Sequence, residues 1–458
     1  MATLDSSSNI FEQATAISAV TIVKTTLAGA AVAPDSLNAG VAGTATVAFT
    51  SAVGLPIGSV VKVTFPSDFT VASATLSSAT NIGSSSSVAA AGSVVSVTVA
   101  GSAVAAGASV SFKLDGVTNP GAKTTGTFAL ATLDSSSNIF EQATAISAVT
   151  IVKTTLAGAA VAPDSLNAGV AGTATVAFTS AVGLPIGSVV KVTFPSDFTV
   201  ASATLSSATN IGSSSSVAAA GSVVSVTVAG SAVAAGASVS FKLDGVTNPG
   251  AKTTGTFALA TLDSSSNIFE QATAISAVTI VKTTLAGAAV APDSLNAGVA
   301  GTATVAFTSA VGLPIGSVVK VTFPSDFTVA SATLSSATNI GSSSSVAAAG
   351  SVVSVTVAGS AVAAGASVSF KLDGVTNPGA KTTGTFALAT LDSSSNIFEQ
   401  ATAISAVTIV KTTLAGAAVA PDSLNAGVAG TATVAFTSAV GLPIGSVVKV
   451  TFPSDFTV

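Results

Sequence analysis

Apolar and polar residues alternate along much of the chain, with the two-residue period of a half-buried β-strand. Between residues 44 and 50, Ala45, Val47 and Phe49 fall on one face, and threonines occupy most of the other. No window shows a sustained 3.6-residue period with helix caps. The pattern therefore predicts an all-β chain of short antiparallel strands. Further stretches with strand character are residues 59–65, 69–76, 94–99, 109–114, 126–133 and 139–152.

Glycine and proline residues mark the turns between these strands. The run at 27–32 is followed by Pro34, which lacks an amide donor and so predicts an edge strand. Residues 54–58 form a turn, and residues 119–121 (Asn-Pro-Gly) have the pattern of a type II turn. Residues 134–138 predict a five-residue hairpin loop. We interpret the serine run at 84–87 as a loop or a flexible bulge, and residues 24–26 as a short connector.

The whole strand pattern repeats without substitution. The sequence Ala-Thr-Leu-Asp at residue 2 recurs at residues 131, 260 and 389, so each step is 129 residues. A unit of that length buries about two thirds of its unfolded surface, which is enough for an independent domain. The expected division is a closing hairpin of a preceding repeat (1–24), three complete β-sandwich repeats (25–153, 154–282 and 283–411) and the opening strands of a truncated repeat (412–458).

The two ends do not complement each other. Joined head to tail, they still lack the equivalents of residues 72–129. A strand swap between neighbouring chains therefore cannot rebuild a whole repeat, and we expect the chain to be a window from a longer array.

Phenylalanine is the only aromatic residue, with 22 copies in the chain. In one repeat, the alternation places Phe at strand positions expected to face inward, in a bed of Val and Ala. We therefore predict that the large core residues are Phe49, Phe65, Phe69, Phe112 and Phe128.

The residues that are missing exclude several classes of function. The chain has no His, Cys, Trp, Tyr or Arg, which removes the commonest general base, thiolate nucleophiles and thiolate metal ligands. Its 14 lysines are spread evenly among 19 acids, so it has no basic patch for nucleic acid. We expect no enzymatic activity and no small-molecule substrate.

A membrane span and a signal peptide are also not expected in this segment. The uncharged run at 69–112 is interrupted by Ser, Thr, Gly and Asn, and its apolar residues alternate as in a strand. The first residues have neither a basic stretch nor an apolar stretch.

Small residues dominate the composition, and two interpretations of that fact stay open. The chain is either an inexpensive protein made in bulk outside the cell, or its composition drifted in one ancestral unit that was then duplicated.

The acids of one repeat are scattered through its loops and strands. Calcium between units is one interpretation, because Asp35 and Asp134 would supply oxygen ligands if they met at an interface. The alternative is solvated loop acids that cap turns. No acidic cluster appears in the sequence, so we predict no catalytic, cofactor-binding or metal-binding residues and no cofactor. The acids concerned are Asp5, Glu12, Asp35, Asp68 and Asp115.

Two motifs of the repeat resemble immunoglobulin-like modules in microbial surface proteins. They are residues 58–69 (Gly-Ser-Val-Val-Lys-Val-Thr-Phe-Pro-Ser-Asp-Phe) and residues 114–121, which are followed by the strand at 127–130. The resemblance implies a β-sandwich used as a spacer, stalk or fibre subunit outside the cell, and it carries no catalytic residues. Some pilus-like sandwich domains contain a Lys–Asn amide cross-link, but Lys62 and Lys113 fall on the outward face, where burial cannot activate their amines.

The sequence favours a structural protein, an extracellular or cell-surface rod or filament that associates with itself head to tail and laterally. The alternative is the stalk of an adhesin whose binding domain lies outside the chain. Short connectors such as residues 153–155 predict little hinge motion between repeats.

Overall fold

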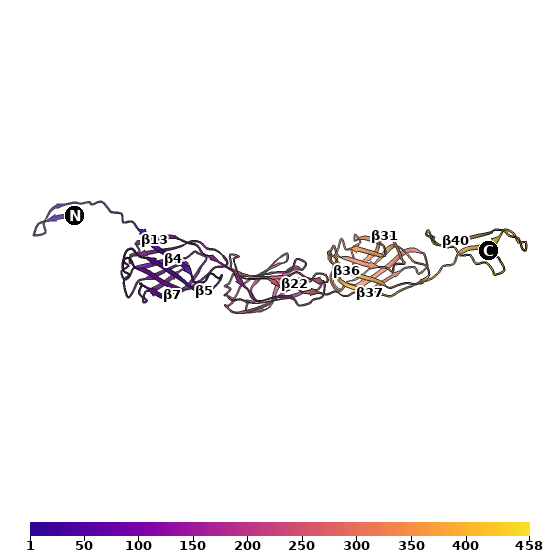
Figure 1. Cartoon of the computed structure of the whole chain (residues 1–458), viewed down its shortest axis with the longest axis horizontal. Coiled ribbons are helices and arrows are strands. Elements are labelled where there is room, and N and C mark those ends of the chain that lie inside the picture. The colour runs from indigo at the N-terminus through magenta and orange to yellow at the C-terminus, as the bar shows by residue number, and fades with distance from the viewer.

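The computed structural model describes residues 1–458, and all its regular structure is β-strand, in 40 segments. Figure 1 shows three strand-rich bodies in a row, with a thin extended segment at each end of the chain. With no helix present, nothing in the chain has the helical length and apolar character needed to cross a bilayer. The predictions of an all-β chain and of a pattern that repeats every 129 residues are confirmed.

The larger sheet of the first repeat has six strands in the order β3-β13-β12-β6-β9-β8. All neighbours in it are antiparallel except β3 and β13, which are parallel. The strands are β3 (Thr25–Thr26), β6 (Val60–Thr64), β8 (Ser87–Ala91), β9 (Val94–Thr98), β12 (Phe128–Leu133) and β13 (Ile139–Ile146).

The smaller sheet has four antiparallel strands in the order β4-β5-β10-β7. They are β4 (Ala28–Pro34), β5 (Ala42–Thr50), β7 (Thr70–Thr80) and β10 (Ser109–Thr118). A separate short pair joins β11 (Lys123–Thr124) to β14 (Thr150–Ile151). As the proline predicted, β4 lies at a sheet edge.

The other two repeats have the same strands, shifted by 129 and 258 residues. Their middle strands include β22 (Ser238–Thr247) and β36 (Phe386–Leu391), which Figure 1 labels in the second and third bodies. The chain ends form two lone hairpins, β1 (Ala2–Leu4) with β2 (Ile10–Gln13), and β39 (Ala415–Pro421) with β40 (Ala432–Thr437).

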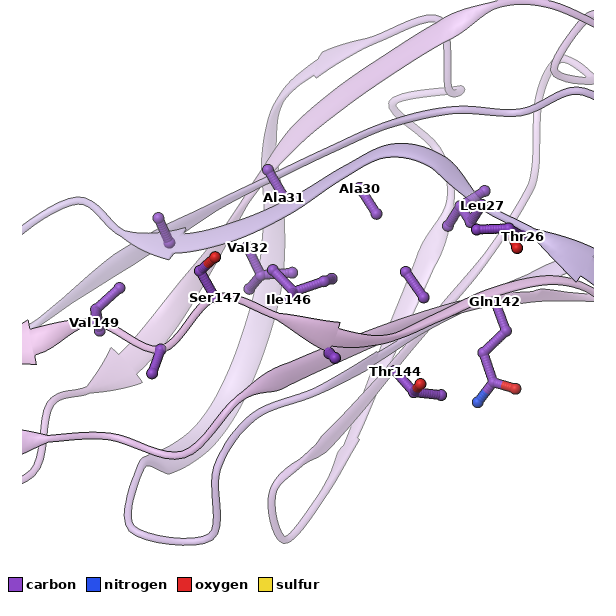
Figure 2. A pocket seen from close by; sticks show the side chains of 14 residues that line it. Thr26, Leu27, Ala30, Ala31, Val32, Gln142, Thr144, Ile146, Ser147 and Val149 are labelled. Atoms are coloured by element: carbon purple, nitrogen blue, oxygen red, sulfur yellow. The ribbon is translucent and has the colours of Figure 1, made fainter.

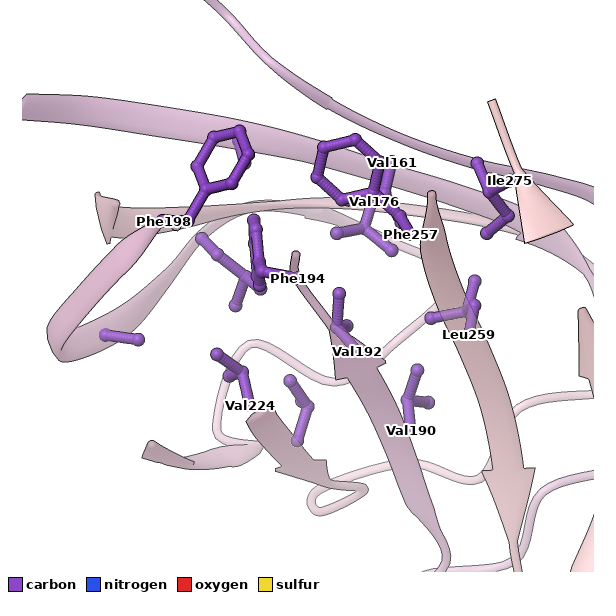
Figure 3. Close-up of a cluster of buried hydrophobic side chains, with 14 of the residues drawn as sticks. Val161, Val176, Val190, Val192, Phe194, Phe198, Val224, Phe257, Leu259 and Ile275 are labelled. Atoms are coloured by element: carbon purple, nitrogen blue, oxygen red, sulfur yellow. The ribbon is translucent and has the colours of Figure 1, made fainter. Parts of the chain in front are cut away.

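The core lies between the two sheets, where the apolar faces of the alternating strands meet. Figure 3 shows this in the second repeat, with Val176 of the smaller sheet and Val190 and Val192 of the larger one in a single cluster. The rings of Phe194 and Phe257 meet edge to face at 5.8 Å. Each such side chain contributes about 1.5–3 kcal/mol by leaving water. All five phenylalanines predicted for the core of one repeat are at most 4% exposed.

Two local predictions are wrong, and a third is right except at its end. The serine run is a loop over residues 84–86, as expected, but Ser87 begins β8, an additional edge strand. Thr25 and Thr26 were expected to be connector, but they form β3, paired with Glu141 and Gln142. Gly121 lacks the positive φ that a type II turn requires at that position. For Thr25, Thr26 and Gly121, partners distant in the sequence decide the local conformation.

The outer face of the smaller sheet carries an ion pair held among threonines. In the second repeat, Lys242 Nζ lies 2.7 Å from Asp164 Oδ2, and the hydroxyls of Thr173 and Thr175 also donate to this carboxylate. The lysine and the two hydroxyls together lower the pKa of Asp164 to about 2. The same arrangement recurs at Asp35 and Asp293.

Candidate functional site, the junction between repeats

The chain passes from the first repeat to the second through a single unpaired residue. Val152 forms a parallel bridge with Asn38 and accepts a 2.9 Å hydrogen bond from the amide of Ala39. Thr154 is already paired with Glu270 of the second repeat, at the start of β15 (Thr154–Thr155). Only Lys153 lies between these anchors, and it also binds the second repeat through Gln271 Oε1 at 2.7 Å. The linker therefore has almost no slack.

An apolar contact closes the junction beside this linker. Val182 and Phe269 of the second repeat lie against Gly40 of the first, and each is 5% exposed. In the first repeat, which has no complete repeat before it, the equivalent Val53 is 40% exposed and the neighbouring Ile139 is 38% exposed. The preceding repeat thus removes these side chains from water, which is the main source of stabilisation at such a contact.

Gly40 makes this approach possible. A Cβ at that position would lie 2.8 Å from both Phe269 Cδ1 and Val182 Cγ2, and the residue has a φ of 70°. Any L-residue here would meet both a steric clash and an unfavourable backbone conformation.

Backbone hydrogen bonds fix the other side of the junction. The amide of Ala122 donates to the carbonyl of Ile268 at 2.8 Å, and the amide of Gly121 donates to Asp263 Oδ2 at 3.1 Å. A Cβ on Gly121 would lie 2.5 Å from the carbonyl oxygen of Asn267. The glycine predicted to shape a turn is therefore needed for the close approach of two repeats.

The second junction repeats every one of these contacts, so the arrangement belongs to the repeat and not to one position in the chain. Its hydrogen bonds have the same lengths, 2.8 Å from Ala251 to Ile397 and 3.1 Å from Gly250 to Asp392. The remaining contacts join Gly169 to Val311 and Phe398, and Lys282 to Gln400.

Two buried polar side chains hold the loops that meet at the junction. On the first repeat, Asn119 donates from Nδ2 to the carbonyls of Ser36 and Asn38, at 2.7 and 2.9 Å, and so ties the loop around Gly40 to the loop around Gly121. On the second repeat, Glu270 is fully buried and accepts hydrogen bonds from Ser180 Oγ at 2.9 Å and the Ala181 amide at 3.1 Å.

The geometry around Glu270 positions one end of the apolar contact. Ser180 Oγ also lies 2.7 Å from the carbonyl of Val182, so its single proton has two acceptors, this carbonyl and the carboxylate. The carboxylate and the serine therefore fix the short loop that presents Val182 to the preceding repeat. A hydrogen bond to a charged group contributes about 1.5–3 kcal/mol.

The acids considered as calcium ligands are not brought together. Asp35 binds Lys113 and two threonines within its own repeat. Asp134 caps its own hairpin loop through Ser136 and Asn138, and its equivalent Asp263 turns to Gly121 of the preceding repeat. No group of three His, Cys, Asp or Glu side chains is placed to hold a metal ion.

The lysines considered for an amide cross-link also have other surroundings. Lys113 forms a surface ion pair with Asp35, and Lys62 is exposed on the outer face of β6. Asn119 donates both of its amide hydrogen bonds to backbone carbonyls.

An open groove lies between β4 and the end of β13. It has a volume of about 660 Å³ in the first repeat, and no ionisable side chain is among its 14 lining residues. Figure 2 shows Val32 and Ile146 together between the two strands, with Ala30, Ala31 and Leu27 further along β4 and its approach. The groove therefore contains no group for acid–base chemistry, and no ionisable side chain lies beside its hydroxyls, those of Thr26, Thr144 and Ser147.

Sequence reasoning missed the residues that form the junction. Phe140 was not among the predicted core residues, although its equivalents Phe269 and Phe398 are 5% and 6% exposed. One signal was available in the strand alternation. Glu141 falls on the inner face of β13, next to a phenylalanine on the opposite face, which is an inverted pattern for a half-buried strand.

Comparisons with known proteins add little to this geometry. No protein-family model matches the chain, and no curated protein matches it. Among solved structures, the chain is similar to one described as "Biofilm associated protein - BSP domain", with 10% identity, 90% of this chain and 86% of that chain covered, and a TM-score of 0.19.

Proposed function

We propose that this chain is a structural protein, an extracellular or cell-surface rod or filament built from tandem, identical β-sandwich domains. The observation that carries the proposal is the junction, where Val152 and Thr154 are each paired within a different repeat and leave only Lys153 between them. A linker of this kind transmits orientation and force from one domain to the next.

We further propose that each domain is an immunoglobulin-like sandwich. In that fold, one sheet has strands A, B, E and D and the other has C, F and G. The order β4-β5-β10-β7 fits the first sheet, and β13-β12-β6 fits the second in the order G, F, C. The additional hairpin β8–β9 extends the second sheet beyond strand C.

The extracellular location is supported by the resemblance of residues 58–69 and 114–121 to surface modules. Arrays of this type have a stability that is the sum of domain terms and nearest-neighbour terms. The apolar contact and the amide hydrogen bonds at each junction supply the interaction free energy between adjacent domains. We therefore expect the rod to be stiff as well as stable.

Small-angle X-ray scattering of the dilute chain tests the rod. We expect the maximum dimension of three domains in line, roughly 10 nm or more for strands rising about 3.3 Å per residue. A variant with Gly-Ser-Gly-Ser inserted after Lys153 and after Lys282 frees both linkers, and its scattering should show a bent ensemble. The matched control carries the same insertions after Gly92 and Gly221, in exposed β-hairpin turns where a Cβ would meet nothing within 4 Å.

A bent ensemble for the unmodified chain, or identical scattering for chains with freed and intact linkers, would contradict the stiff rod.

The stalk of an adhesin has the same domain geometry and differs in its lateral behaviour. Electron microscopy at low micromolar concentration separates the two, since a stalk stays single and a filament subunit makes repeated contacts with its copies.

A further inference from the structure

One lysine of each repeat lies beside the backbone contacts of the junction. Lys123 is the first residue of β11 and follows Gly121 and Ala122, whose amides bond to the second repeat. Its Nζ lies 2.8 Å from Asp68 Oδ2 of the same repeat. The other carboxylate oxygen of Asp68 is buried and has no hydrogen-bond partner. The lysine is therefore the group that compensates the charge of this aspartate, at the end of the domain that meets the next one.

A second aspartate lies near this lysine, on the next repeat. Asp263 opens the hairpin loop that joins two neighbouring strands in the larger sheet of the second repeat. Its Oδ2 accepts the junction hydrogen bond from Gly121, at 3.1 Å, two residues before Lys123. Asp68 raises the pKa of Lys123 through its hydrogen bond and its charge, and the charge of Asp263 raises that pKa further. The ammonium therefore interacts with one carboxylate from each repeat.

The three copies of this lysine show what the next repeat adds. Lys252 has the same surroundings at the second junction. Lys381 of the third repeat forms the same local ion pair, with Asp326 at 2.7 Å, but no hairpin equivalent to residues 262–268 lies beyond it. The side chain is 35% exposed for Lys123 and Lys252 and 53% exposed for Lys381. The next repeat thus covers a lysine whose ion pair within its own repeat is unchanged.

We propose that Lys123 is a positioning residue of the junction, and that its ammonium bridges Asp68 of one repeat and Asp263 of the next. The proposal deepens the proposed rod and rests on it. Without the lysine charge, two carboxylates of like sign remain on opposite sides of the contact, and their repulsion drives the hairpin loop away from Gly121. The lysine therefore adds a charged contact that favours one orientation of the next domain.

This bridge makes the stiffness of the rod depend on ionic strength. The side chains of Lys123, Asp68 and Asp263 are all partly exposed, so salt screens their interaction. The Debye length is about 8 Å at 0.15 M salt and about 3 Å at 1 M salt. The apolar contact at Gly40 has no charge to screen. We therefore expect successive domains to be held more tightly in dilute salt than in concentrated salt.

Double electron–electron resonance between two spin labels measures the junction directly. The chain has no cysteine, so Ala91→Cys and Ala220→Cys place one label on each of the first two repeats, at exposed positions. Lys123→Met replaces the ammonium by an apolar end, and Lys123→Arg keeps the charge. Lys381→Met is the matched control, because it breaks the same local ion pair in a domain outside the labelled junction.

A second pair of variants tests the charge of the partner. Asp263→Asn removes the charge and keeps a side chain that can cap the loop. Combined with Lys123→Met, it also removes the repulsion between the two aspartates, so the double variant should give a narrower distance distribution than Lys123→Met alone. Asp134→Asn is its control, because this aspartate caps the equivalent loop of the first repeat, which has no complete repeat before it.

At about 0.15 M salt, we expect one narrow distance for the labelled parent chain, Lys123→Arg and Lys381→Met, and a distribution at least about twofold wider for Lys123→Met. The parent and Lys123→Met distributions should converge at about 1 M salt, where screening is strong. Equal widths for these two chains at the lower salt, a broad Lys123→Arg distribution, or a Lys381→Met variant that widens the labelled distance overturns the bridge. A narrow distance in every chain refutes only the bridge, whereas a broad parent distribution at the lower salt refutes the stiff rod.

Discussion

Gly40 of one repeat lies directly against Phe269 of the next, where a Cβ would lie 2.8 Å from the ring. Gly169 and Phe398 have the same relationship at the second junction, also at 2.8 Å. Because glycine has no Cβ, the two domains can approach closely enough to share an apolar contact. This glycine therefore helps to set how successive domains are oriented.

Replacing Gly40 with alanine should open the first junction. The new Cβ would meet Phe269 and Val182, and alanine is strained at a φ of 70°, at a cost of about 1–3 kcal/mol. We expect a bend at this junction in electron micrographs and a shorter maximum dimension in scattering. Gly43→Ala is the matched control, because Gly43 has an ordinary φ and a Cβ there would meet nothing within 4 Å. If both variants stay as straight as the unmodified chain, the glycine contact does not set the junction.

Replacing the buried glutamate with glutamine in every repeat (Glu141, Glu270 and Glu399) should destabilise the domains. The carboxylate accepts charge-assisted hydrogen bonds from a serine hydroxyl and a backbone amide, and a glutamine keeps only one neutral acceptor oxygen for them. Replacing hydrogen bonds to a charged group by neutral ones costs about 1 kcal/mol per repeat. Urea unfolding should show a lower midpoint with an unchanged slope. Glu12→Gln, at the exposed equivalent position in the first hairpin, should leave the midpoint where it is.

Acid should weaken the domains through Asp164 and its equivalents. Lys242, Thr173 and Thr175 lower the pKa of this carboxyl from its ordinary 3.8 to about 2. The contribution to stability is therefore fully present above about pH 4 and is lost as the pH falls through about 2. Thermal unfolding measured from pH 5 to pH 2 should show this loss.

The matching lysine variants identify the ion pair as the cause. With Lys113, Lys242 and Lys371 all changed to Met, the chain should lose up to about 1 kcal/mol per repeat at neutral pH, because these pairs are partly exposed. The difference from the unmodified chain should shrink as the pH approaches 2. Lys62, Lys191 and Lys320 make no ion pair, so changing them to Met should leave the pH profile intact. A constant difference at every pH would show that Asp164 does not respond to its lysine.

Asn248 supports the junction from the side of the preceding repeat. Its Nδ2 donates to the carbonyls of Ser165 and Asn167, at 2.7 and 2.9 Å, and the side chain is 5% exposed. Asn248→Ala removes both hydrogen bonds, so we expect a loss of about 1–3 kcal/mol in the second repeat and a bend at the second junction. Differential scanning calorimetry should resolve one weakened domain beside two unchanged ones. A bend without any loss of domain stability would mean that the asparagine acts on the junction alone.

The strands and the core could be predicted because their signals are local. Alternation in residues 44–50 and 109–114 places Val47 and Phe112 on the apolar faces of their strands. The facing sheet covers these faces, and both side chains are fully buried. Pro34 marked an edge strand for an equally local reason, since it lacks an amide donor. The edge strand β8 was missed because its serine and alanine residues have little strand preference of their own, and its pairing with β9 supplies the missing signal.

The repeat period, the all-β class and the inward phenylalanines were determined by the sequence alone, since alternation and identity are properties of the chain itself. The junction was decided only by the tertiary structure, as one residue shows. Phe11, Phe140 and Phe269 occupy identical sequence positions, yet Phe11 is 72% exposed, Phe140 is half-buried and Phe269 is 5% exposed. Burial depends on what packs against a side chain, and for this phenylalanine the covering surface belongs to the preceding domain.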